Sequence, residues 1–263
     1  MVGAMTDITE QKEMTVQLSE LNAVLQENMI ELERTNEELE QFAFVASHDL
    51  QEPLRMITSF MDLLERKYSE QLDSKGLQYI HFATDGAKRM KQIILDLLDY
   101  SKANKRIEDK EDVDINLILS QFKQLRHKLI IETNTTIETN NLPTIKTYKV
   151  AISQIFHCIL DNAIKYSTSS KSPLIKINHI ENNKEWIFSI ADNGIGIDPQ
   201  FHDKIFIIFQ RLHNNNQYSG TGIGLSIAKR HIELLGGQIW VESKLGQGST
   251  FYFKIPKNNS YEK

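Results

Sequence analysis

The sequence is poor in cysteine and in long apolar segments, and each scarcity excludes a class of protein. A single cysteine, Cys158, cannot form an internal disulfide or a cysteine-rich zinc site, and it fits a reducing compartment. No apolar run reaches the ~18 residues of a transmembrane helix. Residues 1–7 lack the basic and apolar parts of a signal peptide. We therefore expect a soluble, cytoplasmic chain, which can still be a piece of a longer protein.

Basic residues are also in deficit. The formal net charge is -5, which is mildly acidic, and nothing suggests the basic face of a nucleic-acid binder, so we expect no nucleic-acid partner. The 263 residues are enough for one large domain or two ordinary ones.

Leucines recur every seven residues in the first part of the chain. This heptad series is typical of a left-handed coiled coil, although Asn28 and Thr35 place polar side chains in its companion seam. A single amphipathic helix packed on a neighbour is the alternative. The heptad positions are Leu18, Leu25, Leu32 and Leu39, with Leu21 and Phe42 in the companion seam.

Two long helical patterns follow one another up to about residue 108, separated by a turn-like segment at 67–76. Asp73 or Ser74 is placed to cap the second helix. Each helix has an apolar stripe wider than one partner can cover. We therefore predict a helical hairpin that forms a dimeric four-helix bundle, so that the partner is a second copy of the chain.

From about residue 112 short strand-like and helical segments alternate. Helical patterns cover 115–129 and 148–166, and strand patterns cover 174–179, 186–191, 238–242 and 251–255. Nine of the 12 glycines lie in the last 70 residues, which indicates loops that bend sharply or approach a ligand. The fold class is therefore α+β, with an α/β sandwich of helices on one mixed sheet after the hairpin.

The segment 47–55 places a histidine beside an acid in the first long helix. His48 is largely neutral at cytoplasmic pH and is then a competent nucleophile, and Asp49 can fix its tautomer or take its proton. Pro53 would bend the helix near this point. An exposed surface histidine next to an ordinary acid is the alternative interpretation.

Three further motifs suit a nucleotide. Asn162 and Lys165 share a helix face and offer a hard oxygen and a phosphate cation, and Tyr166 can pack on a purine. Asp192 follows a buried strand and can accept a hydrogen bond from an adenine amino group. The glycine-rich segment 220–224 opens a helix and exposes backbone N–H groups to phosphate. A polar helix face and ordinary turns are the alternatives for each motif taken alone.

In this order the motifs resemble those of sensor histidine kinases, across about 220 residues. The segment around His48 resembles the phosphoacceptor box, 161–166 the asparagine box, 192–196 and 220–224 the two glycine boxes, and 206–209 the phenylalanine box. The run 246–251 resembles the terminal Gly-x-Gly-Ser/Thr-x-Phe pattern. The amino-acid sequences of 47–55 and 209–213 are similar to those of the bacteriophytochrome-like subgroup. Residues 6–12 resemble the tail of a PAS sensor domain, and a simple helix start is the alternative.

The resemblance implies a Bergerat (GHKL) nucleotide fold after the hairpin, with ATP and Mg²⁺ as cofactors. It implies an enzyme that autophosphorylates His48, assisted by Asp49, and passes the phosphoryl group to the receiver domain of a response regulator. It implies domains at 1–41 (PAS tail and signalling helix), 42–110 (dimerisation and phosphotransfer) and 111–263 (ATP binding). Implied contacts are Asn162 for Mg²⁺, and Lys165, Tyr166, Asp192, Gly194, Gly196, Arg211, Gly220, Gly222, Gly224 and Thr250 for the nucleotide.

Two departures from the family pattern leave alternatives open. Cys158 stands where a second asparagine is common, and a thiol is a poor Mg²⁺ ligand, so a nucleotide-binding scaffold without phosphotransfer stays a rival. Glu52 stands where Thr or Asn often positions water to dephosphorylate the regulator, which leaves the phosphatase activity open. A chaperone-like or topoisomerase-like ATPase of the same fold is a third possibility, and His48 on a hairpin argues against it.

Overall fold

The computed structural model describes residues 9–102, 109–167, 172–210, 212 and 221–257. The chain divides into two compact units, Met1–Asp49 and Leu50–Lys263. The first unit holds the beginning of α1 (Thr9–Tyr68). Its heptad leucines are exposed, from 51% at Leu25 to 72% at Leu32, as expected for a helix whose apolar stripe has no partner within one chain.

The second unit opens with a helical hairpin, made of the rest of α1 and of α2 (Ser74–Lys102). Leu54 packs against Ala87 and Ile94 inside the hairpin. The Asp73 carboxylate accepts a hydrogen bond from the Gly76 N–H at 2.7 Å and so caps α2, which confirms one of the two predicted capping residues. Pro53 lies within α1, and the helix continues through it to Tyr68.

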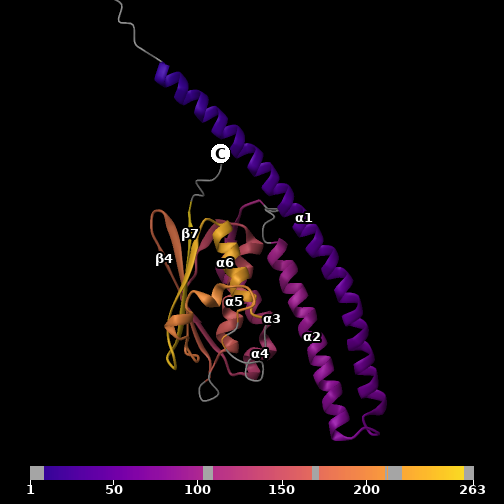
Figure 1. Cartoon of the computed structure of the whole chain (residues 1–263). Helices are drawn as coiled ribbons and strands as arrows, with labels where there is room; N and C mark the ends of the chain where they lie inside the picture. Colours follow the sequence, from indigo (N-terminus) through magenta and orange to yellow (C-terminus); the bar gives the residue numbers. More distant parts are fainter. Residues whose placement is uncertain (1–8, 103–108, 168–171, 211, 213–220, 258–263) are drawn as a thin grey trace, which may run out of the picture. The chain divides into compact units, whose positions relative to one another are not determined.

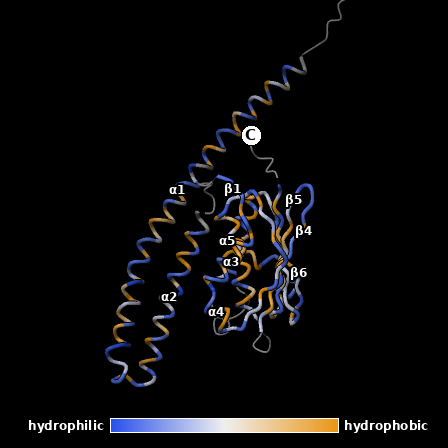
Figure 2. Tube along the Cα trace, turned by 180° about the vertical axis from the view of Figure 1, so that it is seen from behind, coloured by the Kyte–Doolittle hydropathy of each residue, from blue (hydrophilic) through white to orange (hydrophobic). Residues whose placement is uncertain are grey.

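Orange and blue segments alternate along α1 and α2 in Figure 2 because each helix carries an apolar stripe and a polar face. Among the helices of the described residues, none combines the length and the apolar character that a bilayer crossing needs.

After the hairpin, the unit contains one mixed five-stranded sheet in the order β2-β4-β5-β7-β6. Strand β2 is parallel to β4, and the other neighbours are antiparallel. Helices α3, α5 and α6 lie together on one side of this sheet (Figure 1), which confirms the predicted α/β sandwich. The strands are β2 (Thr136–Thr139), β4 (Leu174–Glu181), β5 (Glu185–Asp192), β6 (Gln238–Lys244) and β7 (Gly248–Pro256).

The helices and a small second sheet complete the unit. Strands β1 (Glu111–Asp114) and β3 (Thr144–Thr147) pair antiparallel. The helices are α3 (Ile115–Leu125), α4 (His127–Glu132), α5 (Lys149–Lys165) and α6 (Gly224–Leu234), with short 3₁₀ turns at Pro199–Phe201 and Lys204–Phe206.

Aromatic side chains fix α5 on the sheet. Phe156 of α5 meets Phe188 of β5 and Phe253 of β7 edge-on, with ring centroids 5.6 and 5.5 Å apart, and all three side chains are fully buried. Burying each ring contributes about 1.5–3 kcal/mol. The C-terminal ends of α5 and β5, which carry two of the predicted motifs, are thereby held in a fixed relation.

The structure corrects the predicted elements in two places. The helix expected over 115–129 is interrupted at Arg126, whose backbone angles of φ -99 and ψ 14 end α3 and begin α4. Strands β1, β2 and β3 were not predicted. Each has four residues, too few for an alternating pattern to be recognised.

Candidate functional site

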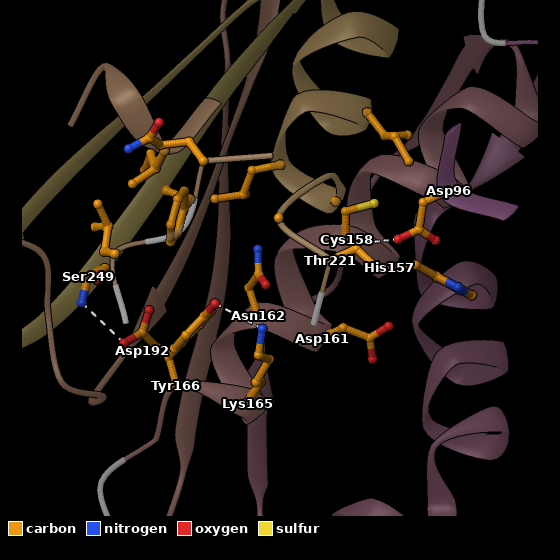
Figure 3. A pocket seen from close by; sticks show the side chains of 18 of the residues that line it. Asp96, His157, Cys158, Asp161, Asn162, Lys165, Tyr166, Asp192, Thr221 and Ser249 are labelled. Carbon is orange, nitrogen blue, oxygen red and sulfur yellow. Dashed lines mark hydrogen bonds between the residues drawn. The ribbon is translucent and has the colours of Figure 1, made fainter. Parts of the chain in front are cut away.

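A cavity of about 430 Å³ lies where the end of α5, the turn after β5, the start of α6 and the beginning of β7 converge (Figure 3). It brings together predicted residues that are far apart in the chain. Asn162, Lys165, Tyr166, Asp192, Gly196, Gly222 and Gly224 all line it.

Asp192 ends β5 and is held by backbone groups from two directions. One carboxylate oxygen, Oδ1, accepts from the Gly194 N–H at 2.8 Å and from the Ser249 N–H at 3.2 Å. Burial raises the pKa of Asp192, and the two N–H bonds oppose this effect. Within the described residues Oδ2 has no hydrogen-bond partner, so it remains an acceptor for a ligand in the cavity.

The turn after β5 packs closely against the backbone of neighbouring segments. A Cβ at Gly194 would lie 2.4 Å from the Tyr166 carbonyl oxygen. A Cβ at Gly196, where φ is +69, would lie 2.1 Å from that of Lys244. The Ile195 N–H donates to the Tyr166 carbonyl at 3.0 Å. Only glycine fits at both positions. Gly196 lines the cavity, whereas Gly194 does not.

The last turns of α5 supply the polar wall. The Lys165 ammonium donates to the Tyr166 hydroxyl at 2.8 Å and lies 4.3 Å from the centroid of the same ring. One turn before Asn162, Cys158 also lines the cavity. Burial raises the pKa of this thiol to about 12, and the nearby acids Asp161, Asp96 and Asp99 reinforce the effect. Cys158 therefore stays a neutral thiol at physiological pH.

The cavity offers few metal-binding side chains, so a cation bound here would take part of its coordination from the bound ligand. In the part of the chain that the structure describes, no group of three or more His, Cys, Asp and Glu side chains is placed to hold a metal ion. The Asn162 carboxamide is a hard oxygen donor of the type that Mg²⁺ accepts, and the neutral Cys158 thiol is not. These residues fit an Mg²⁺ ion that arrives with a polyphosphate.

The opposite wall is the start of α6. Gly222 has a φ of +79 that favours glycine, and Thr221 donates a hydrogen bond to the Asp96 carboxylate of α2 (Figure 3). The N–H groups that begin α6 at Gly224 face no earlier helical turn and are available to an anion. Two predicted contacts, Arg211 and Gly220, lie outside the described residues.

Thr250 does not line the cavity. It alternates on β7 with Ser249 and Phe251, which both do, so its side chain belongs to the other face of the sheet. Sequence reasoning missed Ser249, which holds Asp192 through its backbone. It occupies the Ser/Thr position of the Gly-x-Gly-Ser/Thr-x-Phe pattern at 246–251, which is the signal that could have identified it.

His48 and Asp49 lie in the first unit, at its C-terminal end. Their side chains are 74% and 72% exposed, and the His48 Nδ1 is 3.2 Å from the Asp49 Oδ1. The acid is thus in position to hold the proton on Nδ1, which leaves the lone pair on Nε2 accessible to a reaction partner.

Two family models match the chain. The model described as "His Kinase A (phospho-acceptor) domain" matches residues 38–106. The model described as "Histidine kinase-, DNA gyrase B-, and HSP90-like ATPase" matches residues 147–259. The first includes His48, and the second includes most of the residues that line the cavity.

Curated relatives match over most of this chain but only part of their own length. Cyanobacterial phytochrome A of Nostoc sp. (strain PCC 7120 / SAG 25.82 / UTEX 2576) is 45% identical over 226 residues, which are 86% of this chain and 29% of that protein. Phytochrome-like protein Cph1 of Synechocystis sp. (strain ATCC 27184 / PCC 6803 / Kazusa) is 42% identical over 87% of this chain and 30% of its own length. The chain thus spans about 30% of the length of these relatives.

Solved structures share the fold. Full-length ShkA in complex with AMPPNP matches with a TM-score of 0.63 at 24% identity, over 83% of this chain and 46% of that one. ThkA in complex with the response regulator protein TrrA matches with a TM-score of 0.56 at 23% identity, over 97% and 68%. The predicted recognition and fold class are confirmed, and the chain belongs to the sensor histidine kinases, with a phosphoacceptor domain followed by an ATPase domain of the GHKL fold.

Proposed function

We propose that this chain is the transmitter core of an ATP-dependent protein histidine kinase that autophosphorylates His48. The observation that carries the proposal is the cavity in which residues of three separate motifs converge, Asn162 with Lys165, Asp192, and Gly222. A partly buried carboxylate acceptor and a cation along one cavity are the complement of an adenine base and a phosphate chain. The exposed His48–Asp49 pair provides the acceptor.

In the proposed nucleotide complex Asp192 Oδ2 accepts the hydrogen bond of the adenine amino group. Tyr166 packs beside the base, and Gly196 allows the backbone to pass beneath it. The polyphosphate then runs along Asn162 and Lys165 toward Gly222, Gly224 and the N-terminus of α6. Lys165 must leave the Tyr166 hydroxyl to reach a phosphate, a change of side-chain rotamer only. Arg211 and Gly220 are proposed contacts as well.

Asn162 would hold Mg²⁺ together with the phosphates of the substrate. When bound, the ion neutralises charge on the phosphate oxygens. Since Cys158 cannot replace a second oxygen donor, most of the coordination falls to the nucleotide. We therefore expect the metal and the nucleotide to bind as one unit.

The chemical step follows from the geometry of the acceptor pair. Asp49 keeps the proton on His48 Nδ1, so the lone pair on Nε2 attacks the γ-phosphorus in line with the leaving oxygen of ADP. A nitrogen–phosphorus bond forms and the bond between the γ-phosphorus and the bridging oxygen breaks. The positive charge that develops on the ring is relieved when the Nδ1 proton moves to Asp49.

The proposed partners are a second copy of the chain and a response regulator. The exposed apolar stripes of α1 and α2 support a homodimer. The complex of ThkA with TrrA supports a receiver aspartate as the next phosphoryl acceptor. We propose the domain limits 1–41, 42–110 and 111–263, and a cytoplasmic location, where ATP is available.

A labelling experiment tests the proposal. The wild type, incubated with γ-labelled ATP and Mg²⁺, should incorporate label that is lost in acid and kept in base, as a phosphoramidate is. His48→Gln should abolish incorporation while nucleotide binding persists. His81→Gln is the matched control, since His81 is also exposed and lies 3.2 Å from an acid, Asp85.

Two outcomes would count against the proposal. Undiminished labelling of His48→Gln would refute the phosphoacceptor, and loss of labelling in His81→Gln instead would move the role to that residue. Nucleotide binding without any labelling of the wild type would favour the non-catalytic scaffold to which Cys158 points.

A further inference from the structure

A half-buried ion pair forms part of the cavity wall on the far side of Asn162 from Asp192. The Arg126 guanidinium, at the corner between α3 and α4, donates from Nε to Asp161 Oδ1 at 2.7 Å and from Nη2 to Oδ2 at 2.6 Å. The two side chains are 37% and 35% exposed. Figure 3 shows Asn162 between Asp192 and Asp161. Both members of the pair line the cavity.

The pair leaves part of the guanidinium available. Arginine carries five N–H donors in a planar fork, and the two bonds to Asp161 use two of them. Among the described residues no other group accepts from Arg126. The bidentate contact fixes the plane of the guanidinium, so its remaining donors have a defined direction before any ligand arrives.

Charge at this end of the cavity makes the position significant. Three acidic residues, Asp96, Asp99 and Asp161, line it. Among the described lining residues, the only arginine is Arg126 and the only lysine is Lys165. Lys165 is turned to the Tyr166 hydroxyl. An anionic phosphate chain that extends past Asn162 would meet carboxylates unless a fixed cation stood among them. Arg126 is that cation.

We infer that Arg126 is a further substrate-binding residue, which donates hydrogen bonds to the terminal phosphate of the nucleotide while Asp161 orients its guanidinium. This inference rests on the proposed nucleotide binding. A nucleotide whose base lies at Asp192 places its last phosphate farthest from that residue, which is the direction in which Asn162 and then Asp161 lie. Asp161 is in this arrangement a positioning residue.

The test compares ligands that differ only in their phosphates. Affinities for ATP, ADP and adenosine are measured by calorimetric titration of the whole chain, with Mg²⁺ present. Arg126→Gln should weaken ATP by about tenfold, the order of one hydrogen bond to a charged group, and adenosine by less than twofold. Arg126→Lys should recover part of the loss, because it keeps the charge without the fork. An equal loss for all three ligands, or no loss for ATP, would overturn the inference.

Asp161→Asn separates a substrate contact from a purely structural bridge. It removes a negative charge that repels the phosphate, and its amide keeps one oxygen that can still accept from Arg126 Nε and orient the guanidinium, so ATP should bind at least as tightly as to the wild type. If Arg126 acted only by holding α5 in place, Asp161→Asn would weaken ATP as Arg126→Gln does, and that result would contradict the proposal.

The control for folding is an ion pair of similar exposure away from the cavity. Lys254 and Glu185 lie 3.6 Å apart on the sheet with side chains 35% and 28% exposed, and Lys254→Gln should change melting temperature without changing ATP affinity. A wild type that binds no ATP would refute the proposed function itself. If the wild type binds ATP and Arg126→Gln binds it with the same affinity, this inference alone is refuted.

Discussion

Asp192 is, in the proposed nucleotide complex, both a structural and a binding group. Its Oδ1 joins the turn after β5 to the beginning of β7 through the N–H groups of Gly194 and Ser249. Its Oδ2 has no hydrogen-bond partner among the described residues, and we propose that it accepts from the nucleotide. The cost of this arrangement is a partly buried carboxylate, and its partial desolvation raises the pKa of Asp192.

Replacing Asp192 with asparagine should separate these two roles. The amide oxygen still accepts from both N–H groups, but the amide NH₂ then faces the adenine amino group, donor against donor. We expect ATP to bind at least tenfold more weakly, whereas folding is preserved. Calorimetric titration and thermal unfolding of the variant measure the two effects separately.

The same variant has a predicted pH dependence. Because the folded-state pKa of Asp192 is raised above 3.8, its ionisation opposes folding as pH rises through that value. Below about pH 3.8 both states are protonated and the penalty is absent. Asparagine cannot ionise, so the variant should gain stability relative to the wild type as pH increases toward 7. A relative stability that falls over this range would contradict the burial of the charge.

Short motifs were readable from the sequence because their members are close in the chain. Asn162, Lys165 and Tyr166 lie on one helix end, and the spacing alone placed them together. Ser249 and Arg126 were not found, since their partners Asp192 and Asp161 are 57 and 35 residues away. Such contacts depend on the register of β5 with β7 and on the helix corner, and neither leaves a local pattern.

The long elements were predicted well for a related reason. Helix α5 and strands β4, β5, β6 and β7 carry clear apolar periodicity, and the structure gives them within a few residues of the expected limits. The sequence did not predict strands β1, β2 and β3 or the break at Arg126, because these features depend on tertiary pairing.

The turn between β6 and β7 offers a prediction with an internal control. Gly246 and Gly248 both have positive φ, +78 and +91, but a Cβ at Gly246 meets open space while one at Gly248 would lie 2.1 Å from the Asp192 carbonyl oxygen. Gly246→Ala should cost about 1–2 kcal/mol through backbone strain alone. Gly248→Ala should cost a further ~1–3 kcal/mol from the clash.

Denaturant unfolding measures both variants. Gly248→Ala should in addition weaken ATP, because β7 must move away from Asp192 and carry the Ser249 N–H with it. Equal destabilisation by the two substitutions would show that the close approach at Gly248 contributes nothing.

At the scale of the whole molecule, the heptad leucines of the first unit are exposed to solvent along α1. Leu25 and Leu32 are 51% and 72% exposed along α1, and a second copy would bury them in a shared seam. Replacing both with glutamate should raise the dimer dissociation constant by tenfold or more, since each buried leucine contributes about 1.5–3 kcal/mol.

Sedimentation equilibrium of the double variant measures this change. Ile30→Glu is the matched control, because Ile30 is 67% exposed but lies outside both heptad positions, so its replacement should leave the dimer intact. A double variant with the dissociation constant of the wild type would contradict the coiled-coil seam.

In the proposed nucleotide complex the unshared oxygen of Asp192 would also determine which nucleobase the cavity admits. A carboxylate oxygen can only accept, so it matches a purine with an exocyclic amine at carbon 6 and repels one with a carbonyl at the same place. Guanine and hypoxanthine nucleotides would set oxygen against oxygen in a buried position, where water cannot relieve the mismatch. Selection of ATP over GTP would thus depend on one lone pair of Asp192 Oδ2, whose carboxylate is oriented by the N–H groups of Gly194 and Ser249.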